Sequence, residues 1–154
     1  MSINIEERLK NLGIELPAAP APAANYVPYV IIGNLLFISG QLAQNTTGFV
    51  TGKLGLDLTI EEGYKAARLC GISLISQLKS ACNGDLNKVK SVVRLGGFIN
   101  STADFSEHPK VVNGASDLMV EVFGDIGKHS RAAVGSSSLP FGVAVEVDGI
   151  FEIS

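Results

Sequence analysis

The sequence has no tryptophan, only two cysteines and no cluster of basic residues. Its 12 Lys and Arg residues are outnumbered by 15 Asp and Glu residues, which gives a net charge of −3. Proteins that bind nucleic acid normally carry a basic face or an aromatic stacking surface, so we expect no nucleic-acid partner. No apolar run approaches the ~20 residues of a membrane span. Charged residues are spread through residues 1–16, which is unlike a signal peptide, so we expect no membrane partner either.

The two cysteines indicate a reducing compartment. Cys70 and Cys82 fall in one predicted helix, where twelve residues separate them by ~18 Å, too far for a disulfide. Two unpaired, buried thiols fit the cytoplasm, which is the expected location. The rest of the composition, 46% hydrophobic and 18% charged, is typical of a folded chain. With 154 residues it favours a single domain that needs no disulfide or metal for stability.

The N-terminal residues 1–24 differ from the remainder. Residues 4–12 predict a short helix, which Asn4 caps. The stretch LPAAPAPAAN that follows contains three prolines and therefore predicts an extended strap. We interpret residues 1–24 as a packing or interface appendage, and residues 25–154 as the single domain.

The first half of that domain predicts a hairpin and a long helix. Two apolar runs, Tyr29–Ile32 and Leu35–Ser39, flank the turn Gly33-Asn34. The segment Thr-Ile-Glu-Glu at residues 59–62 matches a capping box. From there apolar and small residues recur at helical spacing as far as Cys82.

The second half predicts three strands and another helix. Residues 89–99 form a strand in which Gly96-Gly97 suggests a bulge. A helix begins near Pro109 and ends at Gly124. A short strand over residues 131–134 precedes a final strand over residues 143–153. Its alternating pattern predicts an edge or interface strand. Together these elements predict an α+β fold, a sheet with two helices packed on one face.

Generic catalytic motifs are missing. There is no GxSxG, so the serines at 136–138 predict a polar loop, and there is no GxGxxG or phosphate loop. His108 and His129 have no partner at metal-ligand spacing, so we expect both at the surface and no metal site.

Arg131 and Glu146 form one pair of oppositely charged residues whose chemistry fits a functional site. Arg131 opens a strand, and Glu146 lies inside an apolar strand that is a candidate neighbour in the sheet. Composition alone favours a partly buried structural ion pair. The functional alternative is that the planar guanidinium holds a substrate carboxylate while the carboxylate orients or deprotonates a water.

A family resemblance gives weight to the functional alternative. The segment SRAAVGSSSLPFGVAVEV at residues 130–147 resembles the C-terminal signature of the Rid (reactive intermediate deaminase) family, also called the YjgF or endoribonuclease L-PSP family. That signature has Arg, Val, Leu-Pro and a strand carrying Glu. Tyr26 followed by GNLLFISGQL resembles the family's hairpin that ends in Ser-Gly-Gln. The resemblance covers residues ~25–154, and the extra N-terminus suggests a longer, divergent subgroup.

The resemblance implies a chorismate-mutase-like α+β fold and a homotrimer with sites between subunits. It also implies an enzyme that hydrolyses reactive enamines and imines, such as 2-imino acids, to 2-oxo acids and ammonia. The implied substrate is a small carboxylate, and no metal or organic cofactor is implied. Two alternatives stay open: an endoribonuclease, and a non-catalytic trimer that binds small carboxylates.

The catalytic residues implied by the resemblance are Arg131, Glu146 and Ser39. Arg131 would pair with the substrate carboxylate, while Glu146 and Ser39 would place the attacking water. A protonated imine is already electrophilic, so positioning and charge do most of the work.

Four further residues are implied to bind the substrate. Tyr26, with Tyr29 as an alternative, would close the pocket. The Gly40 carbonyl and the Ala133 amide would frame the imine, and Asn113 would support the site. Ala133 stands where the family often has Cys, which matters little if that position acts through its backbone amide.

Overall fold

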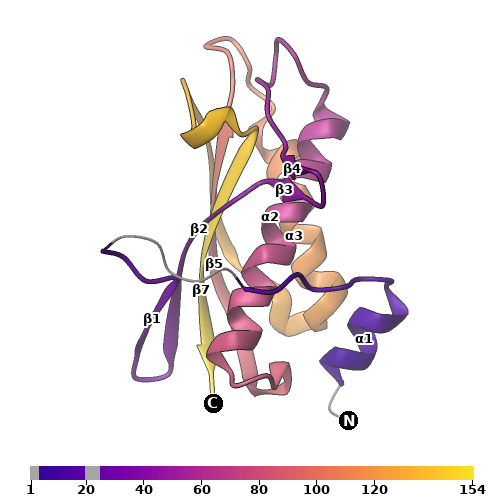
Figure 1. The fold of residues 1–154 in the computed structure, drawn as a ribbon, viewed down its shortest axis with the longest axis vertical. Helices are drawn as coiled ribbons and strands as arrows, with labels where there is room; N and C mark the ends of the chain where they lie inside the picture. Colours follow the sequence, from indigo (N-terminus) through magenta and orange to yellow (C-terminus); the bar gives the residue numbers. More distant parts are fainter. Residues whose placement is uncertain (1–3, 20–24) are drawn as a thin grey trace.

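The computed structural model describes residues 4–19 and 25–154 (Figure 1). These residues form three α-helices of very different length and seven strands. The helices are α1 (Ile5–Asn11), α2 (Ile60–Ala81) and α3 (His108–Phe123), and the strands are β1 (Tyr29–Ile32), β2 (Leu35–Leu42), β3 (Gln44–Asn45), β4 (Gly48–Phe49), β5 (Val89–Asn100), β6 (Ser130–Ser136) and β7 (Val145–Ile153).

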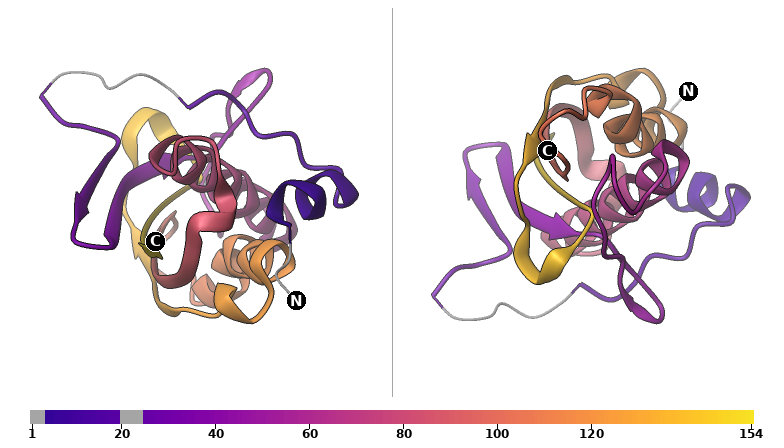
Figure 2. Two further views of the ribbon diagram at one scale, coloured as in Figure 1. Left: turned by 90° about the horizontal axis from the view of Figure 1, so that it is seen from below. Right: turned by 90° about the horizontal axis from the view of Figure 1, so that it is seen from above.

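Five strands form one mixed sheet in the order β1-β2-β7-β5-β6, and β3 pairs with β4 alone. Only β5 and β6 are parallel, and the other neighbours are antiparallel. Helices α2 and α3 lie together on one face of the sheet, where α2 contacts β7 and α3 contacts β5 (Figure 2). The predicted α+β fold with two helices on one face is therefore confirmed.

The final strand is central, so the expectation of an edge strand was wrong. Strand β7 lies between β2 and β5. Val145, Val147 and Phe151 are buried beneath the helices, whereas Glu146 and Asp148 on the opposite face are half-buried. Alternation of apolar and polar residues indicates that helices cover only one face of the sheet. A central antiparallel strand shows this alternation as clearly as an edge strand does, so the pattern does not give the position of the strand in the sheet.

The expected bulge at Gly96-Gly97 was also wrong. The pairing of β5 with β6 runs without interruption from Arg94 to Asn100, and the irregularities of β5 against β7 lie earlier, before Ser91 and Arg94. A Cβ at Gly97 would meet Val112 of α3, and one at Gly96 would meet Asp148. These glycines therefore allow close packing rather than a change of register.

The local signals at the helix ends are confirmed. The Thr59 side chain accepts a hydrogen bond from the Glu62 amide, and the Glu62 carboxylate accepts one from the Thr59 amide. Asn4 caps α1 as predicted, by accepting from the Glu7 amide. The predicted extended strap after α1 has neither helix nor strand over residues 14–19, and its residues 20–24 lie outside the described chain.

Helix α1 belongs to the same core as the rest of the chain. Its Ile5 and Leu9 side chains are buried in the main hydrophobic cluster. The Ile5 amide donates to the Asn87 side chain, and the Arg8 guanidinium donates to the Glu121 carbonyl oxygen. The strap that follows α1 then runs across α2 towards β1 (Figure 1).

Candidate functional site

Arg131 lies on β6, an edge strand of the sheet, and its side chain reaches α3. Its Nη1 donates to Asn113 Oδ1 at 2.8 Å and to Ser116 Oγ at 3.1 Å. Nη1 carries two hydrogens, so these two bonds use both of them. No described residue accepts a hydrogen bond from Nε or Nη2 of Arg131. This second edge of the guanidinium is a planar pair of donors, which matches a carboxylate.

Ser116 and His129 extend this arrangement, and the sequence did not single them out together. Ser116 Oγ lies 2.8 Å from His129 Nε2, and His129 Nδ1 lies 2.6 Å from the Gly127 carbonyl oxygen. Both were findable by spacing. Ser116 follows Asn113 by three residues on the same side of α3, and His129 precedes Arg131 by two residues.

The histidines are not the surface residues that we expected. His129 is half-buried because Ser116 and Gly127 hold its ring. His108 is half-buried because its ring packs edge-on against Phe105, with centroids 5.1 Å apart.

Glu146 lies on the other face of the sheet, beside Gly40 of β2. A Cβ on Gly40 would collide with the Glu146 carboxylate, so that carboxylate occupies the space that the missing side chain leaves. Burial raises the pKa of Glu146, and the nearby Asp148 carboxylate raises it further. A raised pKa makes a carboxylate a stronger base, which suits a group that takes a proton and later gives it back.

Ser39 and Gly40 form an irregularity in β2. The register with β7 shifts between Ile38 and Gln41, so two residues of β2 lie opposite one residue of β7, which is a β-bulge. Ser39 Oγ donates to the Val27 carbonyl oxygen at 2.9 Å. Its lone pairs stay available to accept a hydrogen bond.

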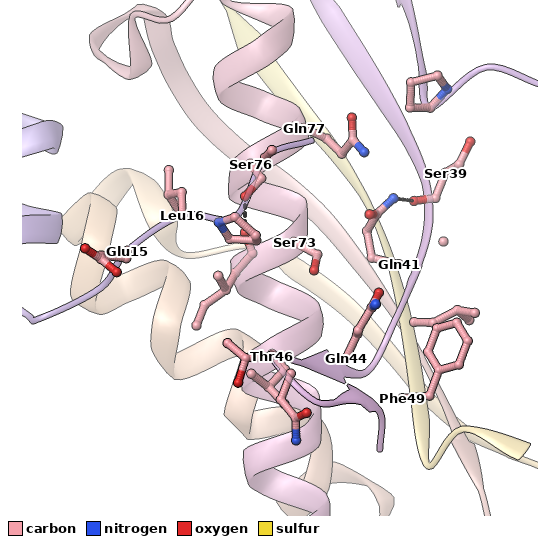
Figure 3. A pocket seen from close by; sticks show the side chains of 18 of the residues that line it. Glu15, Leu16, Ser39, Gln41, Gln44, Thr46, Phe49, Ser73, Ser76 and Gln77 are labelled. Atoms are coloured by element: carbon pink, nitrogen blue, oxygen red, sulfur yellow. Dashed lines mark hydrogen bonds between the residues drawn. The ribbon is translucent and has the colours of Figure 1, made fainter. Parts of the chain in front are cut away.

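A groove of about 780 Å³ begins at this irregularity and runs between β2, α2 and residues 15–18 of the strap (Figure 3). Tyr26, Ser39 and Gly40 line it. Gln77 also lines it, is 1% exposed, and has an Oε1 that no described residue pairs with. Tyr26 is 61% exposed, whereas Tyr29 packs against the core, so Tyr26 is the tyrosine that reaches the groove.

The predicted site residues thus form two separate groups within one chain. The arginine half-site comprises Arg131, Asn113, Ser116 and His129, with Ala133 further along β6 on the same side of the sheet. The glutamate half-site is centred on Gly40, which lies beside the Glu146 carboxylate and lines the groove together with Ser39 and Tyr26, whereas Glu146 itself is not among the lining residues.

The two half-sites do not meet in one chain. Strand β5 lies between β6 and β7, which places Arg131 and Glu146 on strands roughly 10 Å apart. Their side chains also point to opposite faces of the sheet. No ion pair joins them in the described part of the chain, so the interpretation as a structural ion pair was wrong. The strands are not neighbours, and alternation turns the two side chains apart.

Within residues 4–19 and 25–154, no three His, Cys, Asp or Glu side chains gather closely enough to hold a metal ion. None of the helices described is both long and apolar enough to cross a membrane.

Comparison with known proteins supplies the family. The model of the family described as "YjgF/chorismate_mutase-like, putative endoribonuclease" matches residues 6–150. The chain belongs to this family. It is 51% identical to Protein TCP17 of Trypanosoma cruzi over 152 residues, which cover 97% of this chain and 94% of that protein.

One further relative is named for a reaction, and another has a solved structure. The chain is 29% identical to a 2-iminobutanoate/2-iminopropanoate deaminase of Dermatophagoides farinae, over 91% of this chain and 94% of that protein. It also matches the crystal structure of Atu1372, a protein of unknown function from Agrobacterium tumefaciens. That match has a TM-score of 0.91 and 48% identity, over 97% of this chain and 92% of the other. The family therefore includes proteins named for imine deamination as well as for RNA cleavage.

Proposed function

We propose that the protein hydrolyses 2-imino acids to 2-oxo acids and ammonia, without a cofactor, as a cytoplasmic homotrimer. The observation that carries this proposal is the Arg131 guanidinium, held at Nη1 with its Nε and Nη2 edge free for a carboxylate. In the reaction, R–C(=NH₂⁺)–COO⁻ and water give R–CO–COO⁻ and NH₄⁺. The relative named as an imine deaminase supports the same chemistry.

Arg131 binds the substrate carboxylate and so fixes the position of C2. Ser39 Oγ accepts a hydrogen bond from the attacking water, because its own proton is committed to the Val27 carbonyl. Glu146, in its ionised form, takes a proton from that water as the new C–O bond forms and the C=N π pair moves onto nitrogen. The proton then passes to the amine, the C–N bond breaks as C=O forms, and ammonia leaves and takes up the hydroxyl proton.

The remaining roles follow from the same two half-sites. Tyr26 closes the groove, the Gly40 carbonyl and the Ala133 amide frame the imine, and Asn113 holds Arg131. Because the half-sites are apart in one chain, the complete site needs the arginine half-site of one subunit and the glutamate half-site of the next.

The uncovered face of the sheet supports such an assembly. Opposite the helices it carries Phe37 and Val134, which are exposed, and Phe98 and Ile150, which are half-buried. An apolar sheet face left open to solvent marks a protein interface. Arg131 lies on the edge strand β6, where an adjoining subunit can reach it.

The assay that tests this proposal generates 2-imino acids with an amino-acid oxidase and traps them with semicarbazide. The wild-type protein is expected to speed imine loss in competition with the trap. Arg131→Ala should lower this activity at least about tenfold, or ~1.4 kcal/mol, because a charge-assisted pair is lost. Arg68→Ala is the matched control, since Arg68 lies on α2 and pairs with Glu121.

Two results would contradict the proposal. An Arg131→Ala protein as active as the wild type would remove the carboxylate clamp. A folded wild type that never speeds imine loss would favour the non-catalytic trimer that binds small carboxylates. Intact single-stranded RNA after incubation with the protein would exclude the endoribonuclease alternative.

A further inference from the structure

We infer that Ser116 and His129 are positioning residues, which orient Arg131 for carboxylate binding through a chain of hydrogen bonds with one fixed direction. This inference rests on the proposed function, because it concerns how Arg131 is held for its substrate. The chain runs from the Gly127 carbonyl through His129 and Ser116 to the guanidinium.

The direction of each bond follows from what its ends can do. The Gly127 carbonyl oxygen only accepts, so His129 Nδ1 must carry a proton and donate it. Arg131 Nη1 only donates, so Ser116 Oγ must accept from it. The proton of the Ser116 hydroxyl is then free for the third contact, and a neutral His129 accepts it at Nε2. When the His129 ring carries a single proton, at Nδ1, this is the arrangement that satisfies all three contacts.

The role of His129 is to set the rotation of the Ser116 hydroxyl. A serine hydroxyl rotates freely, and in one rotation its proton points at the neighbouring donor. An acceptor at 2.8 Å on the far side directs the proton away from Arg131 and presents a lone pair to Nη1. His129 acts on the guanidinium in this way without touching the substrate.

The consequence for Arg131 is a side chain that is ordered before substrate arrives. Asn113 and Ser116 take both Nη1 hydrogens from one side of α3. This leaves the Nε–H and Nη2–H donors in one plane for the two carboxylate oxygens. Arginine has large rotamer freedom, so fixing it in advance lowers the entropic cost of binding.

Binding of 2-oxobutanoate, a 2-oxo acid of the product class, tests this inference by calorimetry. Ser116→Ala and His129→Phe should each weaken the binding of 2-oxobutanoate about tenfold. The first removes a hydrogen bond to the charged guanidinium of Arg131, and the second removes the acceptor that orients the Ser116 hydroxyl. The conservative variants Ser116→Thr and His129→Gln, which keep a hydroxyl and an acceptor, should stay within about threefold of the wild type. Lys128→Ala is the control, since this exposed amine pairs with Asp125.

Imine hydrolysis gives a second readout. The same two disruptive variants should raise KM while leaving kcat nearly unchanged, whereas a general loss of structure would lower the apparent kcat by reducing the fraction of active protein. Circular dichroism confirms folding, and if His129→Phe does not fold, Ser116→Ala decides the question alone.

The outcomes separate this inference from the proposed function. If Arg131→Ala loses 2-oxobutanoate binding while Ser116→Ala and His129→Phe bind it like the wild type, the positioning role is refuted and the carboxylate clamp stands. If Arg131→Ala itself binds like the wild type, the clamp fails and the positioning role fails with it.

Discussion

Gly40→Ala should reduce imine hydrolysis without unfolding the protein. The new methyl group would lie 2.9 Å from the carboxyl carbon of Glu146 and 3.1 Å from its Cγ, with one carboxylate oxygen closer still. The carboxyl carbon must retreat by at least about 0.6 Å to reach a normal carbon–carbon separation of about 3.5 Å. Displacements of about 1 Å at reacting groups cost up to ~100-fold in rate, so we expect a loss of about 10- to 100-fold in kcat/KM.

The collision involves the end of a flexible side chain, so the protein should stay folded. Moving Glu146 off its preferred rotamer costs about 0.5–1.5 kcal/mol, which lowers Tm by only a few degrees. Gly96→Ala is the matched control, because its methyl group would meet Asp148 on the same face of the sheet instead. The oxidase-coupled assay measures both variants. If Gly40→Ala keeps wild-type activity, Glu146 does not act from the position that the structure gives it.

Two further predictions concern stability. Gly114→Ala places a methyl group against the backbone carbonyl of Tyr64 where α3 crosses α2, and backbone cannot rotate away. We therefore expect the free energy of unfolding to fall by about 1–3 kcal/mol in a denaturant titration. The loss should be smaller for Gly71→Ala, whose methyl group would collide only with the end of the Leu118 side chain, at 2.8 Å, and would make an ordinary contact with the Ala115 backbone. Equal losses would refute this account of the helix contact. Glu146→Gln should raise Tm at about pH 7, because burial and Asp148 raise the pKa of Glu146 and so disfavour its ionised form in the folded chain. This gain in Tm should fall as the pH drops through the raised pKa of Glu146 and vanish below the usual value of 4.5. A Tm difference between the two proteins that is the same at about pH 7 and at a pH below 4.5 would contradict this prediction.

The elements that the sequence predicted are those with local signals. The hairpin turn at Gly33-Asn34, the capping box at Thr59 and the stop of α3 at Gly124 are each encoded within a few residues. The position of β7 in the sheet was not predictable in this way. Alternation shows which side chains are buried, and strand order depends on pairing between segments far apart in sequence.

The functional site likewise has parts that local sequence signals predicted and parts that they did not. The motif around Arg131 was readable, but its bonds to Asn113 and Ser116 join residues 15 to 18 positions apart on different elements. His129 looked like a surface residue because its partner Ser116 lies 13 residues away on another element, and the spacing to Arg131 was the one local signal that pointed to it. The separation of Arg131 from Glu146 also needed the strand order, since β5 precedes both in sequence but lies between them in space.

The central claim is that Arg131 of one subunit works with Glu146 of another. Mixing two inactive variants, Arg131→Ala and Glu146→Gln, and allowing subunits to exchange tests it directly. In a mixed trimer some interfaces bring a native Arg131 from one subunit to a native Glu146 from its neighbour. For equal, random mixing we predict recovery of about a quarter of the wild-type rate of imine hydrolysis. If the exchanged mixture is as inactive as the two variants alone, no site is shared between subunits, and the account is contradicted.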